Sequence, residues 1–248
     1  MISAYLQGGL GNQMFQIATA TALAKRNKNK ACFNFNNCHT PLQGNTSKKY
    51  KHTVFSEICD RDNIKISSVY NEPKFSYTEI PYTKDLLIKG YFQSYKYFED
   101  YENDIQELFT LPTSIVRAGY DNITSVHVRR GDYVNLKHYH GICDLEYYQN
   151  AMKEIGNSHF LFFSDDMDWV KENFKGDNIS YSNYDEEIID LALMSICHNN
   201  IIANSSFSWW GAYLNKNKNK KVIAPKNWFG PKGPKDTQDL IPPSWIKM

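Results

Sequence analysis

Apolar runs alternate with amphipathic stretches throughout the second half of the chain. Each run is short and bounded by polar residues, so the runs predict buried strands, at 123–128, 159–163, 179–181, 200–203 and 221–224. Apolar residues at helical spacing predict helices between them, over 145–155, 167–174, 186–197 and 207–214. Strands that alternate with helices indicate an α/β fold, in which a parallel sheet carries helices on both faces.

The first half of the chain has a less regular pattern. Residues 36–85 are polar and rich in Lys, Asn and Tyr, so we interpret them as loops with short elements. Elsewhere in this half, apolar periodicity is clearer. The first half ends at Leu111-Pro112. The predicted elements are strands at 2–6, 31–35 and 86–92 and helices at 12–26 and 96–108.

Composition and charge narrow the class of protein. The 248 residues fit one large domain or two small ones that share a cleft, and the 42% of hydrophobic residues suffices for a packed core. The formal net charge of +1 provides no global basic field, so we expect no nucleic-acid partner. A small anionic ligand would need only a local group of cations.

The cysteines and the N-terminus bear on location. An odd number of cysteines without a C-x-x-C pair predicts reduced thiols, not a disulfide framework or a zinc site. The N-terminus lacks the features of a signal peptide, and no apolar run approaches the roughly 18 residues of a membrane span. We therefore expect a cytoplasmic protein without an integral membrane span; peripheral attachment to the inner membrane stays open. The cysteines are Cys32, Cys38, Cys59, Cys143 and Cys197.

Three polar clusters directly follow predicted strands of the second half. His127–Asp132 follows one strand, Ser164–Asp166 follows the next, and Asn204–Phe207 follows a third and opens a helix. The carboxyl ends of parallel strands meet at one edge of a sheet, where open α/β folds bind their ligands. We therefore expect the three clusters to form one ligand site.

Arg129 and Arg130 are candidates for phosphate binding. Guanidinium groups supply bidentate, permanently charged donors, which would stabilise a departing diphosphate. Because neighbouring residues of a strand point to opposite faces, we expect one arginine to bind phosphate and the other to form a supporting salt bridge, with Asp132 as a candidate partner. The alternative is that both arginines serve only as ion-pair residues.

Asn204, Ser205, Ser206 and Phe207 have two interpretations. Small hydroxyl residues at a helix N-terminus present backbone N–H groups and the positive end of the helix dipole to an anion. Ordinary N-capping by Ser or Asn produces the same pattern.

Asp165 and Asp166 allow three interpretations. An acidic pair can hold a divalent metal, cap the helix that begins near Met167, or bind the base or ribose of a nucleotide. Since arginines are available to neutralise phosphate, we predict no metal.

The glycine-rich segment Gly8–Gln13 matches a dinucleotide-binding loop only in part. The third glycine of G-x-G-x-x-G is replaced by Met14, and no acidic residue lies about 20 positions on, which disfavours a redox Rossmann protein. Either the backbone approaches a ligand here, with Asn12 at the helix N-terminus, or the glycines form a tight turn between strand and helix.

Six segments, in order along nearly the whole chain, are similar to glycosyltransferase family 11, the bacterial and animal alpha-1,2-fucosyltransferases. The most specific are HVRRGDY at 127–133 and NIIANSSFSWWGAYLN at 200–215. The others are GGLGNQMFQIA at 8–18, GYFQSYKYF at 90–98, FSDDMDWV at 163–170 and VIAPKNWF at 222–229.

This resemblance implies a GT-B-like α/β architecture, with two Rossmann-like halves that face each other across a cleft. The expected domains are an acceptor-side half at 1–118, a GDP-sugar-binding half at 119–232 and an extended tail at 233–248. It implies a galactoside 2-alpha-L-fucosyltransferase with GDP-fucose as co-substrate, no cofactor and no metal. The expected acceptor is a galactose-terminated oligosaccharide or lipid-linked glycan of the cell surface, modified at O2 of galactose.

The resemblance also implies roles for single residues. Arg129 or Arg130 would grip the donor diphosphate, His127 would lie near guanine or ribose, and Asn12 would reach the donor across the cleft. The expected catalytic group is Arg129, Arg130 and Asp132. The expected donor-binding set is Gly11, Asn12, His127, Arg129, Arg130, Asp165, Asn204, Ser205, Ser206 and Phe207.

The expected reaction is a single in-line displacement, in which an acceptor hydroxyl attacks the anomeric carbon and GDP leaves with inversion. The general base is left open, because Asp132 can equally serve to orient an arginine. The alternatives are a transferase for another GDP-sugar and a non-catalytic module that binds nucleotide or glycan. The stretch at 36–85 is short for the family, so the acceptor is not assigned.

Overall fold

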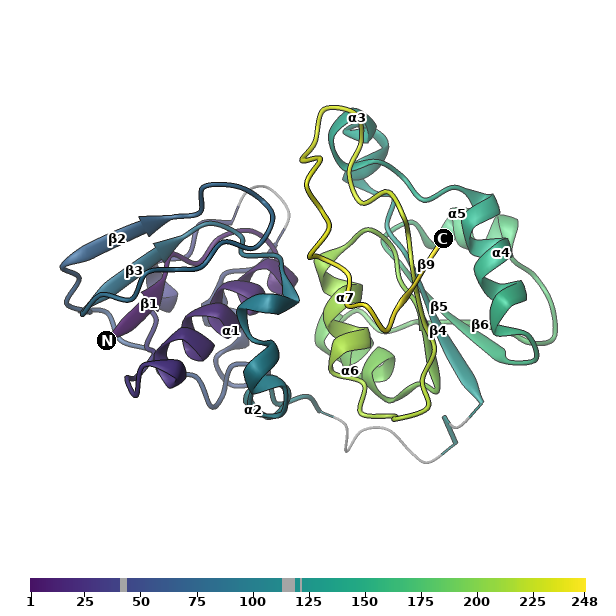
Figure 1. Cartoon of the computed structure of the whole chain (residues 1–248). Helices are drawn as coiled ribbons and strands as arrows, with labels where there is room; N and C mark the ends of the chain where they lie inside the picture. The colour runs from purple at the N-terminus through teal and green to yellow at the C-terminus, as the bar shows by residue number, and fades with distance from the viewer. Residues whose placement is uncertain (41–43, 113–118, 121) are drawn as a thin grey trace. The chain divides into compact units, whose positions relative to one another are not determined.

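The computed structural model of the chain describes residues 1–40, 44–112, 119–120 and 122–248 (Figure 1). The chain divides into two compact units. The first unit consists of Met1–Thr110 with Asp236–Pro242, and the second consists of Leu111–Lys235 with Pro243–Met248. The C-terminal residues are therefore shared between both units.

The first unit contains a three-stranded parallel sheet in the order β1-β3-β2. Helix α1, Leu10–Arg26, packs against β1, and most of its residues from Leu10 to Ala24 are buried, including two glutamines. Apolar residues on nearly every side of this helix explain its central place in the unit. The other elements are β1 at Ile2–Ala4, β2 at Ser68–Asn71, β3 at Leu86–Lys89, α2 at Glu102–Leu108, and 3-10 turns η1 to η4 at Phe35–Asn37, Ser47–Tyr50, Tyr95–Tyr97 and Glu99–Tyr101.

The structure corrects three predictions for the first half. The segment 31–35 forms isolated bridges instead of a strand. Strand β3 ends before position 92 because Gly90 and Phe92 have positive φ angles of 155° and 51°, which take the backbone out of the sheet. The helix expected at 96–108 is divided into 3-10 turns and α2, since Phe98, with φ −140° and ψ 13°, lies outside the helical conformation. Strand β2 was not predicted.

The prediction of reduced cysteines is wrong for Cys32 and Cys59, which form a disulfide with an S–S distance of 2.16 Å. Its physical basis is a bridge between the backbones: the Phe33 amide donates to the Cys59 carbonyl at 2.8 Å, which brings the two cysteine Cα atoms to 4.7 Å. The other cysteines, Cys38, Cys143 and Cys197, are free. The cysteine count therefore no longer supports a reducing compartment.

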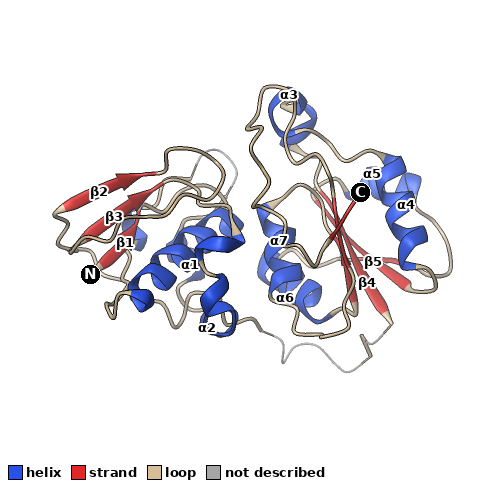
Figure 2. Cartoon of the chain, viewed as in Figure 1, coloured by secondary structure: helices blue, strands red, loops and turns tan. Residues whose placement is uncertain are grey.

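The second unit contains a six-stranded parallel sheet in the order β6-β5-β4-β7-β8-β9. Figure 2 labels its strands β4 and β5 and the helices of this unit. The strands are β4 at Ile123–Val128, β5 at His159–Ser164, β6 at Ile179–Tyr181, β7 at Asn199–Ile201, β8 at Val222–Ala224 and β9 at Ile246–Lys247. The helices are α3 at Lys137–His140, α4 at Leu145–Ile155, α5 at Met167–Asn173, α6 at Glu187–Ile196 and α7 at Ser206–Tyr213, with a 3-10 turn η6 at Asp132–Val134.

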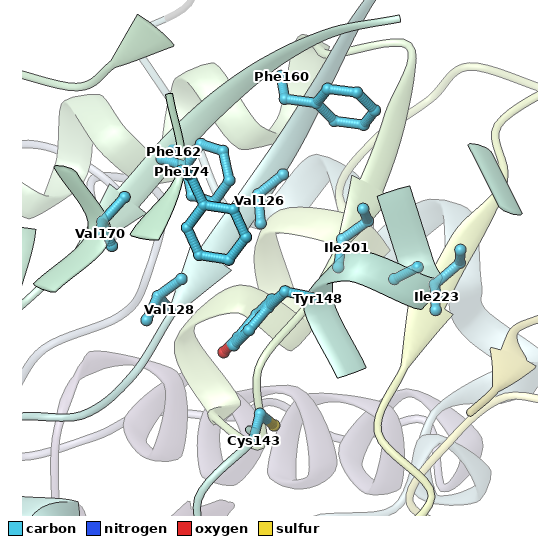
Figure 3. Packing of buried hydrophobic residues seen from close by; sticks show 11 residues of the cluster. Val126, Val128, Cys143, Tyr148, Phe160, Phe162, Val170, Phe174, Ile201 and Ile223 are labelled. Atoms are coloured by element: carbon cyan, nitrogen blue, oxygen red, sulfur yellow. The ribbon is translucent and has the colours of Figure 1, made fainter. Parts of the chain in front are cut away.

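Alternate strand residues face two different helix layers. On β5, Phe160 and Phe162 join the core formed with α4 and α5, whereas Phe163 packs with Leu193 and Met194 of α6. Figure 3 shows the first of these cores, in which side chains from β4, β5 and the two helices point toward one another. The same alternation holds on β4. Val126 and Val128 join the first core, whereas His127 between them lies beside Phe207 of α7.

The structure confirms the predicted α/β class with parallel sheets, and each strand and helix predicted for the second half has a counterpart. Strand β9, the short helix α3 and the turn η6 were not predicted. Over the described ranges, no helix is long and apolar enough to cross a membrane.

Candidate functional site

The site lies in the second unit, at the carboxyl ends of three adjacent strands. Strand β4 lies between β5 and β7, and its last residue, Val128, is in register with Ser164 of β5. The segments 129–132, 165–166 and 204–207 therefore leave the sheet at the same edge. The predicted convergence of three polar clusters is what the topology produces.

Arg129 lies between two carboxylates. Its Nη2 is 2.7 Å from Asp132 and its Nη1 is 2.8 Å from Asp165, and its guanidinium lies 5.1 Å from the centre of the Tyr133 ring. The side chain is a quarter exposed. The guanidinium plane is thus held in a fixed orientation at the sheet edge, which favours bidentate recognition of an anion.

Arg130 has different side-chain partners from Arg129. Its Nε is 3.0 Å from Asp166, and its guanidinium stacks 4.2 Å above the ring of Trp169, a residue of α5. Its backbone amide donates to Asp165 at 2.8 Å. Arg130 therefore ties the loop after β4 to the start of α5.

His127 is buried and uncharged. Burial, with a contribution from the nearby charge of Arg129, lowers the pKa of its imidazole to about 3. Its ring lies 5.7 Å from the ring of Phe207, and its Nδ1 has no hydrogen-bond partner among the residues that the structure describes. A buried nitrogen without a partner costs free energy, which makes His127 a candidate for ligand binding.

The acidic pair divides into two roles. Asp166 caps α5, because its side chain accepts a hydrogen bond from the Trp169 amide at 3.3 Å. Asp165 instead spans both arginines, and a Cβ on Gly131 would lie 2.4 Å from its carboxylate oxygen. Only glycine fits at position 131 without moving this carboxylate. Nowhere in the described chain do three or more His, Cys, Asp or Glu residues gather as a metal site would require.

The cluster at 204–207 also divides. The Asn204 amide donates to the carbonyls of His140 and Trp228, and its oxygen accepts from Cys143, so this side chain joins three segments of the unit. Ser205 occupies the N-cap position of α7 without a capping hydrogen bond from its side chain. Ordinary side-chain capping therefore does not explain this serine, whereas Ser206 and Phe207 remain partly exposed at the helix N-terminus.

Asp190 is a polar residue of this unit that the sequence analysis missed. It lies near the start of α6, which follows β6, and it accepts a hydrogen bond from Ser182. Burial is the main cause that raises the pKa of its carboxyl to about 6. Its sequence signal was one acidic residue among the apolar positions of a helix, directly before buried Leu191.

In the first unit, the glycine-rich segment forms a turn from β1 into α1. Gly8 has a φ of +79°, and a Cβ there would lie 2.5 Å from Nδ2 of Asn12. Gly11 is buried within α1. The Asn12 oxygen accepts a hydrogen bond from Gln93 at 2.6 Å. The segment is therefore a tight turn from strand into helix, in which Asn12 is held at the start of the helix.

Comparisons with known proteins show which proteins the chain is similar to. An O-antigen biosynthesis glycosyltransferase, WbnK of Escherichia coli, is 31% identical over 98% of this chain and 99% of its own length. An alpha-1,2-colitosyltransferase of Escherichia coli is 30% identical over 100% and 99%. Human galactoside alpha-(1,2)-fucosyltransferase 1 is 27% identical over 85% of this chain and 64% of that protein.

Fold comparison gives the same type of architecture. The crystal structure of the fucosyltransferase NodZ from Bradyrhizobium matches with a TM-score of 0.53, at 15% identity, over 85% of this chain and 91% of that one. The family model for glycosyl transferase family 11 matches residues 1–248. The chain therefore belongs to glycosyl transferase family 11.

Proposed function

We propose that the protein transfers L-fucose from GDP-fucose to a galactose-type acceptor, with inversion at the anomeric carbon and without a metal. The observation that carries this proposal is the side of the strand on which each motif residue lies. Along β4 and the loop after it, His127 faces Phe207, whereas Arg130 faces Trp169 of α5. Arg129 contacts Asp132, Asp165 and Tyr133, and its charge contributes to the lowered pKa of His127, so we assign it to the side of His127.

On this assignment, Arg129 binds the diphosphate and Arg130 supports the loop. The start of α7, with partly exposed Ser206, adds backbone N–H groups and the positive end of a helix dipole on the same side. Both features act on the charge that develops on the leaving diphosphate, which is the main electrostatic demand of the reaction. Asp132 holds the Arg129 guanidinium in orientation.

The nucleoside is assigned to the neighbouring residues. Neutral His127 offers an unpartnered Nδ1 to a ribose hydroxyl or a base, and Phe207 offers a ring face for stacking. We assign Asp190 to guanine, whose N1–H and N2–H donors suit one carboxylate. Asn204 is assigned a positioning role, because its amide already binds two backbone carbonyls.

The finer architecture and the acceptor are part of the same proposal. We propose a GT-B arrangement in which the second unit binds the nucleotide and Asn12 of the first unit contributes to donor binding. The acceptor is a galactose-terminated oligosaccharide or lipid-linked glycan. Support comes from relatives that are named galactoside alpha-(1,2)-fucosyltransferases.

A second donor is favoured by one observation: the relative that matches the whole chain at 30% identity is a colitosyltransferase. Colitose is fucose without its 3-hydroxyl group, so GDP-colitose would fit the same nucleotide site. A site with a hydrogen-bonding partner for that hydroxyl would reject colitose strongly, whereas a site without one would accept both sugars.

The test is release of GDP from GDP-fucose, GDP-colitose and GDP-mannose, each with lactose and with both N-acetyllactosamine linkages. Acceptor-dependent release from GDP-fucose supports the proposal, and preferential release from GDP-colitose selects the second donor. Binding of GDP with no release from any donor and acceptor pair would refute transferase activity with these substrates. Addition of EDTA is expected to leave the rate unchanged.

A further inference from the structure

Glu72 occupies an unusual place in the first unit. It directly follows strand β2, and its two carboxylate oxygens accept separate backbone hydrogen bonds, from Tyr91 at 2.7 Å and from Phe92 at 3.0 Å. Those amides belong to the segment after β3, the neighbouring strand of the sheet. One side chain thus fixes the carboxyl-terminal exits of two adjacent strands.

The segment that Glu72 binds has an unusual backbone conformation. A Cβ on Gly90 would lie 2.3 Å from Cβ of Glu72, so the two chains approach as closely as glycine permits. Phe92 adopts a φ of +51°, which is rare for an aromatic residue. Its buried ring packs edge-on against Tyr97. The carboxylate compensates this conformation by satisfying two amides that the turn leaves without strand partners.

The shaped segment leads directly to Asn12. Gln93, the residue after Phe92, is buried, and its amide donates to the Asn12 oxygen at 2.6 Å. This bond fixes the orientation of the Asn12 side chain at the start of α1. Glu72 therefore fixes the backbone of 91–92, this backbone positions Gln93, and Gln93 orients Asn12.

We propose that Glu72 is a positioning residue for donor binding, which acts by fixing the segment 90–93 so that Gln93 orients Asn12. The inference rests on the proposed function, in which Asn12 contacts the donor. Glu72 itself touches no reacting atom in this scheme.

The protonation state of Glu72 provides a specific signature. Burial raises the pKa of its carboxyl to about 7, against the opposing effect of the two backbone hydrogen bonds. The titratable side chains that face it are Tyr70 and Tyr97, whose own pKa values are raised, first by burial and then by Glu72, so both stay neutral near pH 7. Protonation converts one carboxylate oxygen into a hydroxyl oxygen, which is a weaker acceptor, so one of the two amide hydrogen bonds weakens. The contribution of Asn12 to donor binding should therefore weaken as the pH falls through 7.

The experiment compares wild type, Glu72→Gln, Glu72→Asp, Asn12→Ala and the double variant Glu72→Gln/Asn12→Ala, with exposed Glu79→Gln as the matched control. We expect Glu72→Gln to raise the donor KM about tenfold, the loss typical of one hydrogen bond to a charged group, with the acceptor KM unchanged. Adding Asn12→Ala to it should cause no further loss. The part of the decline in donor kcat/KM that occurs near pH 7 should disappear in Glu72→Gln, whereas the decline through pH 6 that we assign to Asp190 should remain.

Two outcomes would overturn the inference. Either Glu72→Gln keeps the wild-type donor KM and pH profile, or its effect multiplies with that of Asn12→Ala, which would show independent action. Amide hydrogen exchange of Tyr91 and Phe92 in the wild type, from pH 6 to pH 8, needs neither a folded variant nor turnover. Protection that does not change with pH would also refute the mechanism. If no donor is turned over, the proposed function fails, whereas the exchange result still decides the role of Glu72.

Discussion

The replacement of Arg129 by lysine tests the assignment of the two arginines most directly. The guanidinium joins Asp132 at 2.7 Å and Asp165 at 2.8 Å, and both contacts fix its plane. Lysine keeps the charge but cannot bridge two carboxylates and a phosphate with planar geometry. Loss of one preorganised donor to a developing oxyanion lowers kcat by about 100- to 1,000-fold, or roughly 2.7–4 kcal/mol.

The cost to stability should be much smaller. Lysine keeps a positive charge beside Asp132 and Asp165, so neither carboxylate loses its cation, although the Arg129 side chain is only 25% exposed and its partners are 20% and 27% exposed. The loss is then that of one hydrogen bond, about 1 kcal/mol of the free energy of unfolding. A hundredfold loss of turnover with a melting temperature lowered by only a few degrees would therefore locate the effect in the site and not in the fold.

Arg130→Lys is the matched control, because it changes the next residue and the same functional group. Lysine can keep a cation over Trp169, which lies 4.2 Å from the Arg130 guanidinium, so the loss of stability should be about 1 kcal/mol or less. We expect less than a tenfold change in kcat/KM for the donor, measured by GDP release under first-order conditions. A larger loss of donor kcat/KM in Arg130→Lys than in Arg129→Lys would refute the assignment of the diphosphate to Arg129. Wild-type turnover in both variants would remove the phosphate site from this motif.

Three further predictions concern separate features. Burial raises the pKa of the Asp190 carboxyl to about 6, so this group is ionised above pH 6. Donor KM, measured from initial rates, should therefore rise as the pH falls through 6, and it should be high at all pH values in Asp190→Asn. In Gly131→Ala, the added Cβ would lie 2.4 Å from the Asp165 oxygen, so GDP affinity, measured by calorimetry, should fall about tenfold. The disulfide between Cys32 and Cys59 closes a loop with a sequence separation of 27, so its reduction should cost roughly 3–4 kcal/mol of unfolding free energy, measured by denaturant titration with and without a reductant. An unchanged transition in reductant, with the thiols shown to be reduced by mass spectrometry, would contradict that value.

The second half of the fold could be predicted from the sequence because its pattern and its structure have the same period. Phe160, Phe162 and Phe163 are buried on both faces of β5, and a continuous apolar run is what a central parallel strand requires. The first half could not be predicted equally well. Short strand β2 has half-buried and exposed residues in alternation within a polar stretch, and such a weak signal is indistinguishable from a loop.

The limits for the site were of a different kind. Sequence order placed Arg129, Asp165 and Ser205 at strand ends, and a parallel topology then brought them to one edge. Side-chain partners were not accessible in this way: Asn204 looked like a ligand residue, but it binds carbonyls from segments 64 and 24 residues away. The bond between Cys32 and Cys59 was missed for the same reason, because pairing depends on a backbone bridge and not on the number of cysteines.

The charges at the site argue for preorganisation over simple attraction. Two guanidinium groups lie among three carboxylates, Asp132, Asp165 and Asp166, so the formal charge of this group is negative although it is assigned to an anion. Net charge therefore cannot attract the diphosphate. What the carboxylates do is hold the guanidinium planes still, which spares the cost of ordering flexible side chains when charge develops on the leaving group. Neutral His127 is consistent with this arrangement. A positive charge on the buried imidazole would repel the Arg129 guanidinium and weaken the ion pairs that hold it in place.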